Sequence, residues 1–396
     1  MHDRLPVLAT ATLGVVTIVG FGVWLYGYGV LLEPILADTG WSEAVLSSTY
    51  GVSLLGAGVL ATLVGRLLHR QGSRRVYGIG AVVAAAAYLA LAAATDEVAF
   101  AVAGVVAGSV TGALGYYAAV HTVIAQLVPV GDRTKAITTN TLWGAFASPI
   151  FLPLMAWMVL RLDWRPTVQL TGVAVAVAFL LAAVAVPDSR GADDGPASLR
   201  AALSAAARDP VVRALLLTTF AGGIVTSLVI LYQVPAMVTA GLTLAMASSL
   251  AGARGFIQLA GRIPVPWLIR RMGSRSSLRL AHVLTGVSCL ILPFAGRIPV
   301  AIAFAVVAGV AIGALVPVES IFSAEAVPGS SLGIVLGVSS LTRGVGAALG
   351  PMLGGSLTTL VGTRTPSLVL MSLVAAAGAL LVPALRSQHD LGPRAA

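Results

Sequence analysis

The chain alternates between long apolar segments and short polar ones. Twelve segments are apolar over about 20 residues or more, the length an α-helix needs to cross the hydrocarbon layer of a membrane. They cover 7–36, 45–67, 76–95, 98–128, 136–160, 166–187, 211–238, 244–269, 277–296, 299–324, 333–360 and 366–385. The pattern therefore predicts an all-α membrane protein with twelve transmembrane helices. The long polar interruption at 188–210 divides it into two six-helix halves, 1–187 and 211–396.

Composition and charge support a protein embedded in a lipid bilayer. Hydrophobic residues make up 58% of the chain and charged residues 10%, against about 25% charged in soluble domains. With the N-terminus in the cytoplasm, 17 of the 24 Lys and Arg residues fall in cytoplasmic segments, 4 in outer loops and 3 within the apolar segments. Because cytoplasmic loops of membrane proteins are enriched in Lys and Arg, both termini and the linker are expected to be cytoplasmic. The net charge of +9 then reflects orientation in the cell (inner) membrane, and no nucleic-acid partner is expected.

A short basic turn occurs once in each half. The sequence "RQGSRR" at 70–75 follows the second apolar segment, and "RMGSRSS" at 271–277 follows the eighth. This spacing of half a chain indicates two copies of one six-helix unit. Many secondary transporters are built from such repeats, and their substrate sites lie between the repeats near the membrane midplane.

These turns resemble the loop motif of the major facilitator superfamily, Gly-x-x-x-Asp-Arg-x-Gly-x-Arg. The residues that match or replace motif positions, and that the resemblance assigns to gating, are Gly65, His69, Arg70, Gly72, Arg74 and Arg75 in the first copy and Arg270, Arg271 and Gly273 in the second. His69 and Arg270 stand where the family has Asp, which takes part in charge pairing that holds one access state. The departure therefore concerns gating and not the fold.

Three further stretches are similar to the branch that contains monocarboxylate transporters and the oxalate/formate antiporter. They are "YGYGV" (26–30), "GWS" (40–42) and "LDWRPTVQLTG" (162–172). The resemblance implies a monomer that moves a small carboxylate, first of all a monocarboxylate, by alternating access with proton coupling. Three alternatives stay open: a dicarboxylate exchanger, a multidrug-type efflux carrier and, more remotely, an anion-sensing membrane receptor.

The stretch "ARGFIQLAGRIPVP" (253–266) places two arginines in an apolar segment. Arg254, Gln258 and Arg262 are four residues apart, so on a helix they form one slanted polar stripe about 12 Å long. Charges at this depth normally face a cavity or a partner, and a guanidinium can hold a carboxylate with two parallel hydrogen bonds. The resemblance assigns the substrate carboxylate to Arg262 and puts Gln258 where monocarboxylate carriers often have Asp. The alternative for Arg262 is that it pairs with a resident acid and only locks a conformation. The alternative for Arg254 is that it lines the outer vestibule.

Other polar residues within the apolar segments are further candidates for substrate binding. Arg343 stands where the oxalate/formate antiporter has a cation, and two cations facing one pocket would suit a dianion; otherwise Arg343 reaches out to the membrane surface. Tyr117 matches an aromatic hydroxyl that helps bind the carboxylate in the resembling family. Weaker candidates are Tyr26, Tyr28, Asn140, Trp143, Tyr232 and Gln233.

Two titratable residues are candidates for proton coupling. Glu319 lies well inside an apolar segment, as a proton carrier or as the counter-ion of Arg262 or Arg343. His121 titrates near physiological pH, although a hydrogen-bonded structural role is the simpler interpretation. The sequence contains no phosphate-binding loop and no cluster with the spacing of metal ligands, so neither a cofactor, a metal nor an enzymatic activity is expected.

Overall fold

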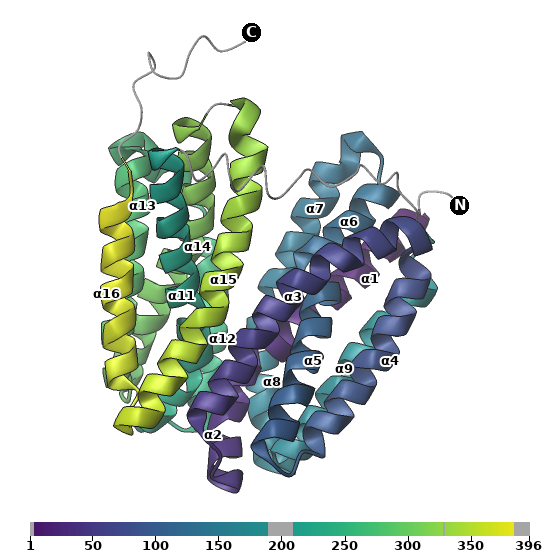
Figure 1. Ribbon diagram of the computed structural model, residues 1–396, viewed down its shortest axis with the longest axis horizontal. Coiled ribbons are helices and arrows are strands. Elements are labelled where there is room, and N and C mark those ends of the chain that lie inside the picture. The colour runs from purple at the N-terminus through teal and green to yellow at the C-terminus, as the bar shows by residue number, and fades with distance from the viewer. Residues whose placement is uncertain (1–3, 189–208, 328, 384–396) are drawn as a thin grey trace.

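The structure is a computed structural model that describes residues 4–188, 209–327 and 329–383. Its helices form two bundles that stand side by side, one built from α1–α9 and the other from α11–α16 (Figure 1). Ten helical segments in these ranges are long and apolar enough to cross a membrane, and the 17-residue helices α12 and α16 complete the set of twelve. A linker was predicted at 188–210, and most of it lies outside the described residues.

The helices begin and end as follows. The first bundle contains α1 (Arg4–Gly20), the π-helix η1 (Phe21–Tyr26), α2 (Tyr28–Thr39), α3 (Glu43–Gln71), α4 (Ser73–Ala92), α5 (Glu97–Gly115), α6 (Tyr117–Leu127), α7 (Val130–Ala145), α8 (Ala147–Leu162) and α9 (Trp164–Ala185). The second contains α11 (Pro210–Thr239), α12 (Leu244–Ala260), α13 (Val265–Ile291), the 3₁₀-helix η2 (Leu292–Phe294), α14 (Ile298–Ala326), α15 (Gly329–Val361) and α16 (Thr365–Leu381).

The predicted span 244–269 is wrong at its second end. Helix α12 stops at Ala260, four residues form a turn, and α13 begins at Val265. Pro264 and Pro266 cause the break, because proline removes a backbone donor and clashes with the preceding turn. Arg262 therefore lies beyond the end of α12, and the polar stripe on the helix is limited to Arg254 and Gln258.

Three other predicted spans are interrupted although their hydropathy is continuous. Span 7–36 passes through the π-helix η1, span 98–128 breaks at Tyr116, and span 136–160 breaks at Phe146. Local π-helical turns occur often at functional sites. Each of these interruptions lies within one residue of a side chain that lines the pocket described below.

The repeated basic turn has the same backbone conformation in both halves. Gly72 has φ 82° and ψ 163°, and Gly273 has φ 78° and ψ 161°. Both φ values are ones that L side chains rarely adopt, which explains why glycine occupies both positions. The internal repeat inferred from the sequence is thus present in the structure at this turn.

The "LDWRP" stretch ties helices of the first bundle together. Trp164 donates from Nε1 to Asp38 Oδ2 at 2.8 Å, and Arg165 donates from Nη1 to the same oxygen at 2.7 Å. The Arg165 guanidinium also lies 4.2 Å from the centre of the Trp164 ring. The stretch therefore holds the start of α9 against the end of α2.

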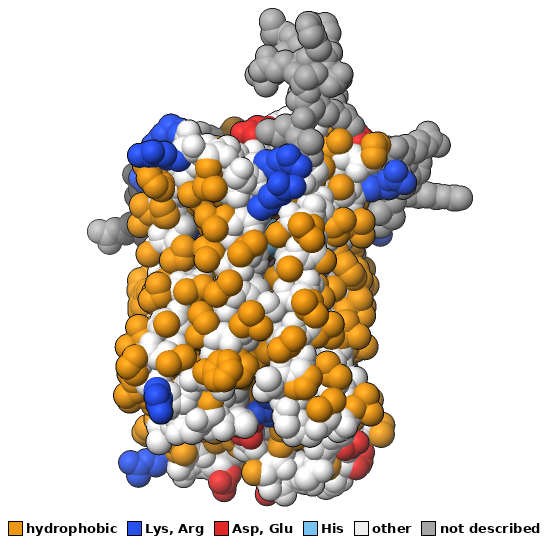
Figure 2. Space-filling model, turned by 90° about the vertical axis from the view of Figure 1, so that its left-hand side faces the viewer, with side chains coloured by type: hydrophobic (Ala, Val, Ile, Leu, Met, Phe, Trp, Pro, Cys, Tyr) orange, Lys and Arg blue, Asp and Glu red, His pale blue; other side chains and the backbone are white. Residues whose placement is uncertain are grey.

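The molecule has two different ends. We call the end that contains the Gln71–Ser73 turn and the first described residue, Arg4, the basic end, and the opposite end, which contains Arg364, the Arg364 end. Figure 2 shows a broad band of hydrophobic side chains between these ends, with the charged side chains gathered at the top and bottom. This distribution fits a protein that spans a bilayer.

The two bundles meet through small residues. A Cβ atom on Gly51 of α3 would collide with the carbonyl oxygen of Ala348 on α15, and one on Gly355 would collide with Ser47. Towards the basic end α3 and α15 diverge (Figure 1), and a Cβ on Gly58 would meet no atom within 4 Å. The bundles thus touch towards the Arg364 end and separate towards the basic end.

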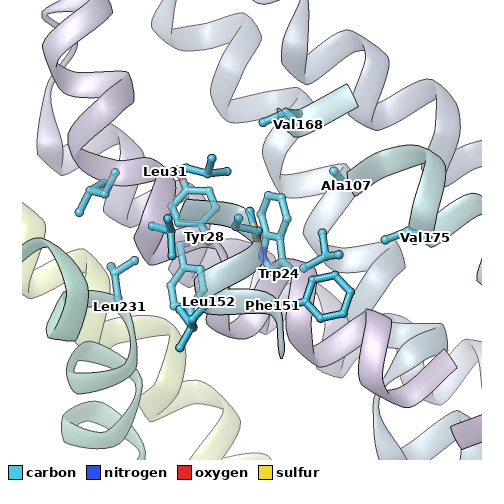
Figure 3. Packing of buried hydrophobic residues seen from close by; sticks show 14 of the residues in the cluster. Trp24, Tyr28, Leu31, Ala107, Phe151, Leu152, Val168, Val175 and Leu231 are labelled. Atoms are coloured by element: carbon cyan, nitrogen blue, oxygen red, sulfur yellow. The ribbon is translucent and has the colours of Figure 1, made fainter. Parts of the chain in front are cut away.

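A dense apolar cluster lies beside this contact. Figure 3 shows Trp24 and Tyr28, from η1 and α2, packed with Phe151 and Leu152 of α8 and facing Leu231 of α11. Trp24 donates from Nε1 to Ser53 Oγ at 2.7 Å, so its polar atom is satisfied within the core. The cluster forms a solid layer in which these side chains are buried.

Candidate functional site

A polar pocket lies between the bundles, with about 330 Å³ of space between its walls, part of it open to solvent. Both bundles contribute to it. Its walls are formed by Tyr26, Tyr117, Thr141, Gly144, Ala145 and Ser148 from the first bundle and by Gly255, Gln258, Leu259 and Arg262 from the second. A ligand in this pocket would contact both halves at once.

Arg262 is the charged residue of the pocket wall. It follows the end of α12 and is exposed, and its backbone N–H donates to the carbonyl of Leu259 at 3.2 Å. Within the described part of the chain, no carboxylate lies within ion-pair distance of its guanidinium. A resident acid does not neutralise Arg262 in this conformation, which disfavours the purely locking role.

Arg254 lies directly behind the pocket wall and is completely buried. Its Nε donates to Gln233 Oε1 at 2.7 Å, and its Nη1 donates to Gln258 Oε1 at 2.9 Å. The remaining nitrogen, Nη2, is buried and has no hydrogen-bond partner among the residues that the structure describes. Because Gln258 itself lines the pocket, one amide side chain separates this guanidinium from the pocket.

Tyr117 is held in place on the opposite wall. Its hydroxyl donates to the carbonyl of Thr141 at 3.3 Å, and its ring stacks on His121 with centroids 5.0 Å apart. A Cβ on Gly144 would collide with the Tyr117 hydroxyl, so a larger residue there would force Tyr117 to shift. The structure thus brings Tyr117, Gln258 and Arg262 together.

Tyr28 and Asn140 do not line the pocket, contrary to the prediction. The Tyr28 hydroxyl donates to the carbonyl of Leu46 at 2.8 Å within the core. Asn140 is buried and donates from Nδ2 to Thr17 Oγ1 at 3.1 Å. The rotation of helices α2 and α7 about their axes turns these two side chains away, whereas Tyr26, two residues before Tyr28, reaches the pocket.

Arg343 also lies away from the pocket. It forms an ion pair with Glu319 of α14, and Thr219 of α11 donates to the second carboxylate oxygen at 2.6 Å. The idea that Arg343 and Arg262 face one pocket is therefore wrong for this conformation. Glu319 acts as the counter-ion of Arg343, one of the two partners that the sequence suggested.

Two histidines lie next to these groups. His121 is half-buried beside Tyr117, and its Nε2 atom is buried with no hydrogen-bond partner within residues 4–188, 209–327 and 329–383. His282, which the sequence analysis did not single out, is buried close to Arg343: a Cβ on Gly222 would lie 3.4 Å from the ring of His282 and 3.5 Å from Arg343 Nη1.

The two basic turns, to which the resemblance assigns gating, contact carboxylates from elsewhere in the chain. In the first copy the backbone N–H of Arg74 donates to Asp188 Oδ1 at 3.4 Å, and His69 lies 3.2 Å from Gln126. In the second copy Ser274 donates to Glu325. Arg75, Arg270 and Arg271 are exposed. Asp188 and Glu325 were missed because they lie far from both turns in the sequence.

A charge cluster at the Arg364 end was also missed. Arg364 donates from Nε and Nη2 to the two oxygens of Glu43 at 2.9 and 2.7 Å, pairs with Glu33 and donates to Thr239 Oγ1 at 2.8 Å. Burial acts to lower the pKa of Arg364, but Glu43 and then Glu33 outweigh it and raise the pKa above its ordinary value. In the sequence Arg364 counted only as one of four outer basic residues. In the structure it joins the two bundles where they are closed.

A membrane-spanning protein of two bundles with a polar pocket between them has the architecture of a secondary transporter. The chain matches the sequence profile of the Major Facilitator Superfamily over residues 12–296 and again over 234–394. It belongs to this superfamily, as the sequence motifs indicated.

Solved structures agree on the fold. The nucleoside transporter NupG superposes with a TM-score of 0.80 at 14% identity, covering 94% of this chain and 98% of NupG. A D-xylose–proton symporter gives 0.72 at 17% identity, covering 97% and 98%. A bacterial homologue of the human lysosomal transporter Spinster, in an inward-facing and occupied conformation, gives 0.71 at 15%, covering 96% and 94%. All three are transporters and not enzymes. No curated protein sequence gives a significant match.

Proposed function

We propose that this chain moves a small carboxylate anion, most readily a monocarboxylate, across the cell membrane by alternating access. The observation that supports this most is the uncompensated guanidinium of Arg262 in a pocket shared by both bundles. Tyr117 and Gln258 add a hydroxyl and an amide within the same pocket. With both termini in the cytoplasm, as the distribution of Lys and Arg favours, the separated basic end would face the cytoplasm.

The charge balance favours a monoanion over a dianion. Arg343 would be a second cation for a dicarboxylate, but Glu319 neutralises it. Two of the structural neighbours named above are a nucleoside transporter and a D-xylose–proton symporter, whose substrates are uncharged. An uncharged substrate is disfavoured by Arg262 in the pocket wall and Arg254 behind it. Cations without resident acids favour an anionic ligand. A dicarboxylate exchanger is the second candidate, since Arg254 and Arg262 together would also fit two negative charges.

The first test is the variant Arg262→Ala in reconstituted vesicles. Losing a bidentate pair removes two charge-assisted hydrogen bonds, each worth about 1.5–3 kcal/mol, so uptake of radiolabelled lactate or formate should fall at least about 100-fold. Arg161→Ala is the matched control, because Arg161 is an exposed arginine at the end of α8. Undiminished uptake by Arg262→Ala would overturn the role of Arg262 in anion binding.

The second test concerns proton coupling at Glu319. We expect uptake to acidify the vesicle interior, reported by a trapped pH-sensitive dye, and we expect this acidification to disappear in Glu319→Gln. The physical reason is that a carboxylate paired with Arg343 can take up a proton when the pair separates, whereas an amide cannot. His121→Gln tests the other candidate in the same assay. Proton movement that persists in Glu319→Gln and stops in His121→Gln would move the coupling to the first bundle, and uptake without acidification by the unmodified protein would indicate exchange.

A further inference from the structure

Arg254 is a buried cation that lacks a counter-ion within the described residues. It is fully buried, and its two hydrogen-bond acceptors are neutral amide oxygens, those of Gln233 and Gln258. The buried nitrogen Nη2 has no hydrogen-bond partner in the described parts of the chain. A buried charge is costly unless it is paired and hydrogen-bonded. The chain keeps this arrangement directly behind the wall of its central pocket.

We propose that the transported anion is the missing counter-ion, and that it passes from Arg262 to Arg254 as the transporter closes around it. This inference rests on the proposed function. Gln258 lies between the two arginines in the sequence, with Arg254 on α12 and Arg262 in the turn that follows the end of this helix at Ala260. Arg262 is exposed and Arg254 is buried, so the two guanidinium groups form an outer and an inner station for one negative charge.

Gln258 connects the two stations. In the structure its Oε1 accepts a hydrogen bond from Nη1 of Arg254, while the neighbouring Nη2 has no hydrogen-bond partner among the described residues. When the amide swings aside, Nη1 and Nη2 together present two parallel donors, which fits one carboxylate. An acid at position 258 would fill this place permanently. The glutamine therefore leaves the positive charge available to the substrate.

The inner station also links anion binding to the closing of the two halves. Tyr26, from the π-helix η1 of the first bundle, lines the same pocket as Gln258 and Arg262. An anion on Arg254 could accept a hydrogen bond from Tyr26 as the bundles approach each other. The loaded inner station would thus be stabilised by contacts from both halves.

The test is to give Arg254 a permanent counter-ion. Gln233→Glu places a carboxylate oxygen where the 2.7 Å hydrogen bond to Nε now ends, and Gln233→Met is the matched control without charge. We expect Gln233→Glu to raise the melting temperature of the ligand-free protein and to weaken its stabilisation by acetate or lactate about 10- to 100-fold in apparent affinity, the loss of one or two charge-assisted hydrogen bonds. Gln233→Met should remain responsive to both carboxylates. A Gln233→Glu protein that has the unmodified melting temperature, or that responds to acetate undiminished, would overturn the assignment.

Nitrate is a planar monoanion that is not a carboxylate. Measurements with nitrate distinguish failure of the Arg254 assignment from failure of the proposed function. If nitrate stabilises the unmodified protein but carboxylates do not, and Gln233→Glu abolishes the nitrate effect, Arg254 is an anion site and only the carboxylate assignment is wrong. If carboxylates stabilise both proteins equally, the proposed function holds and the inner station is wrong. If no anion has an effect, both are wrong.

Discussion

Replacing Arg364 with alanine is expected to open the end of the molecule that this residue holds closed. Arg364 joins the α15–α16 turn to Glu33 and Glu43 of the other bundle, and its side chain is only 9% exposed. Removing one partner of a buried ion pair costs about 3–5 kcal/mol. The equilibrium between the closed and open forms of this end should therefore shift by about two to four orders of magnitude.

Cysteine labelling would measure this opening. Ser47 is buried at the contact between α3 and Gly355, so Ser47→Cys should react with a membrane-impermeant maleimide only when the Arg364 end opens. The natural Cys289 is buried and would be replaced by serine to remove any background. Arg297→Ala, at an exposed position on the same end, is the control. Equal labelling rates with and without Arg364→Ala would show that the ion pair does not hold this end closed.

The second large effect is expected from Arg343→Met, which would leave the buried carboxylate of Glu319 without its cation. The exposed fraction of the Glu319 side chain is 7%, so water cannot replace the lost partner. We expect the free energy of unfolding to fall by about 3–5 kcal/mol, measured by denaturant titration in detergent micelles.

A double variant distinguishes the contribution of the Arg343–Glu319 ion pair from other contributions of the Arg343 side chain to stability. In Arg343→Met with Glu319→Gln, neither position of the pair is left as a buried charge without its partner, so most of the lost stability should return, in keeping with strong coupling between contacting groups. A double variant as unstable as Arg343→Met alone would mean that the Arg343 side chain stabilises the fold by packing, independently of its charge.

The fold could be predicted from the sequence because a bilayer imposes one strong condition. Backbone groups within lipid must be hydrogen-bonded internally, so long apolar segments become helices. The turn at Gly72 and its copy at Gly273 then revealed the repeat. Hydropathy could not reveal the breaks at Tyr116 and Phe146, since both sides of each break are apolar. Hydropathy also led to a predicted span, 244–269, that extends beyond the helix break caused by Pro264 and Pro266.

The candidate site could be predicted in part. Gln258 and Arg262, from one short segment, and Tyr117 and Tyr26, from other helices, were expected to line a cavity and do line the pocket. Pairs formed between distant helices, such as Arg343 with Glu319 or Arg364 with Glu43, depend on how each helix is rotated about its axis. In a sequence this apolar throughout, no pattern fixes those rotations, and Tyr28 and Asn140 were misplaced for the same reason.

The crossing of α3 and α15 near Gly51 divides α3 into a long part towards the basic end and a short part towards the Arg364 end. Twenty residues of α3 extend from Gly51 to Gln71, an arm of roughly 30 Å, but only eight extend to Glu43, an arm of roughly 12 Å. If the halves pivot at this crossing, a rotation of about 10° moves the basic end by about 5 Å and the Arg364 end by about 2 Å. The same small rotation would thus narrow the opening at the basic end by about 5 Å, while at the Arg364 end it would separate the two halves by about 2 Å, enough to take the hydrogen bonds of Arg364 beyond their reach.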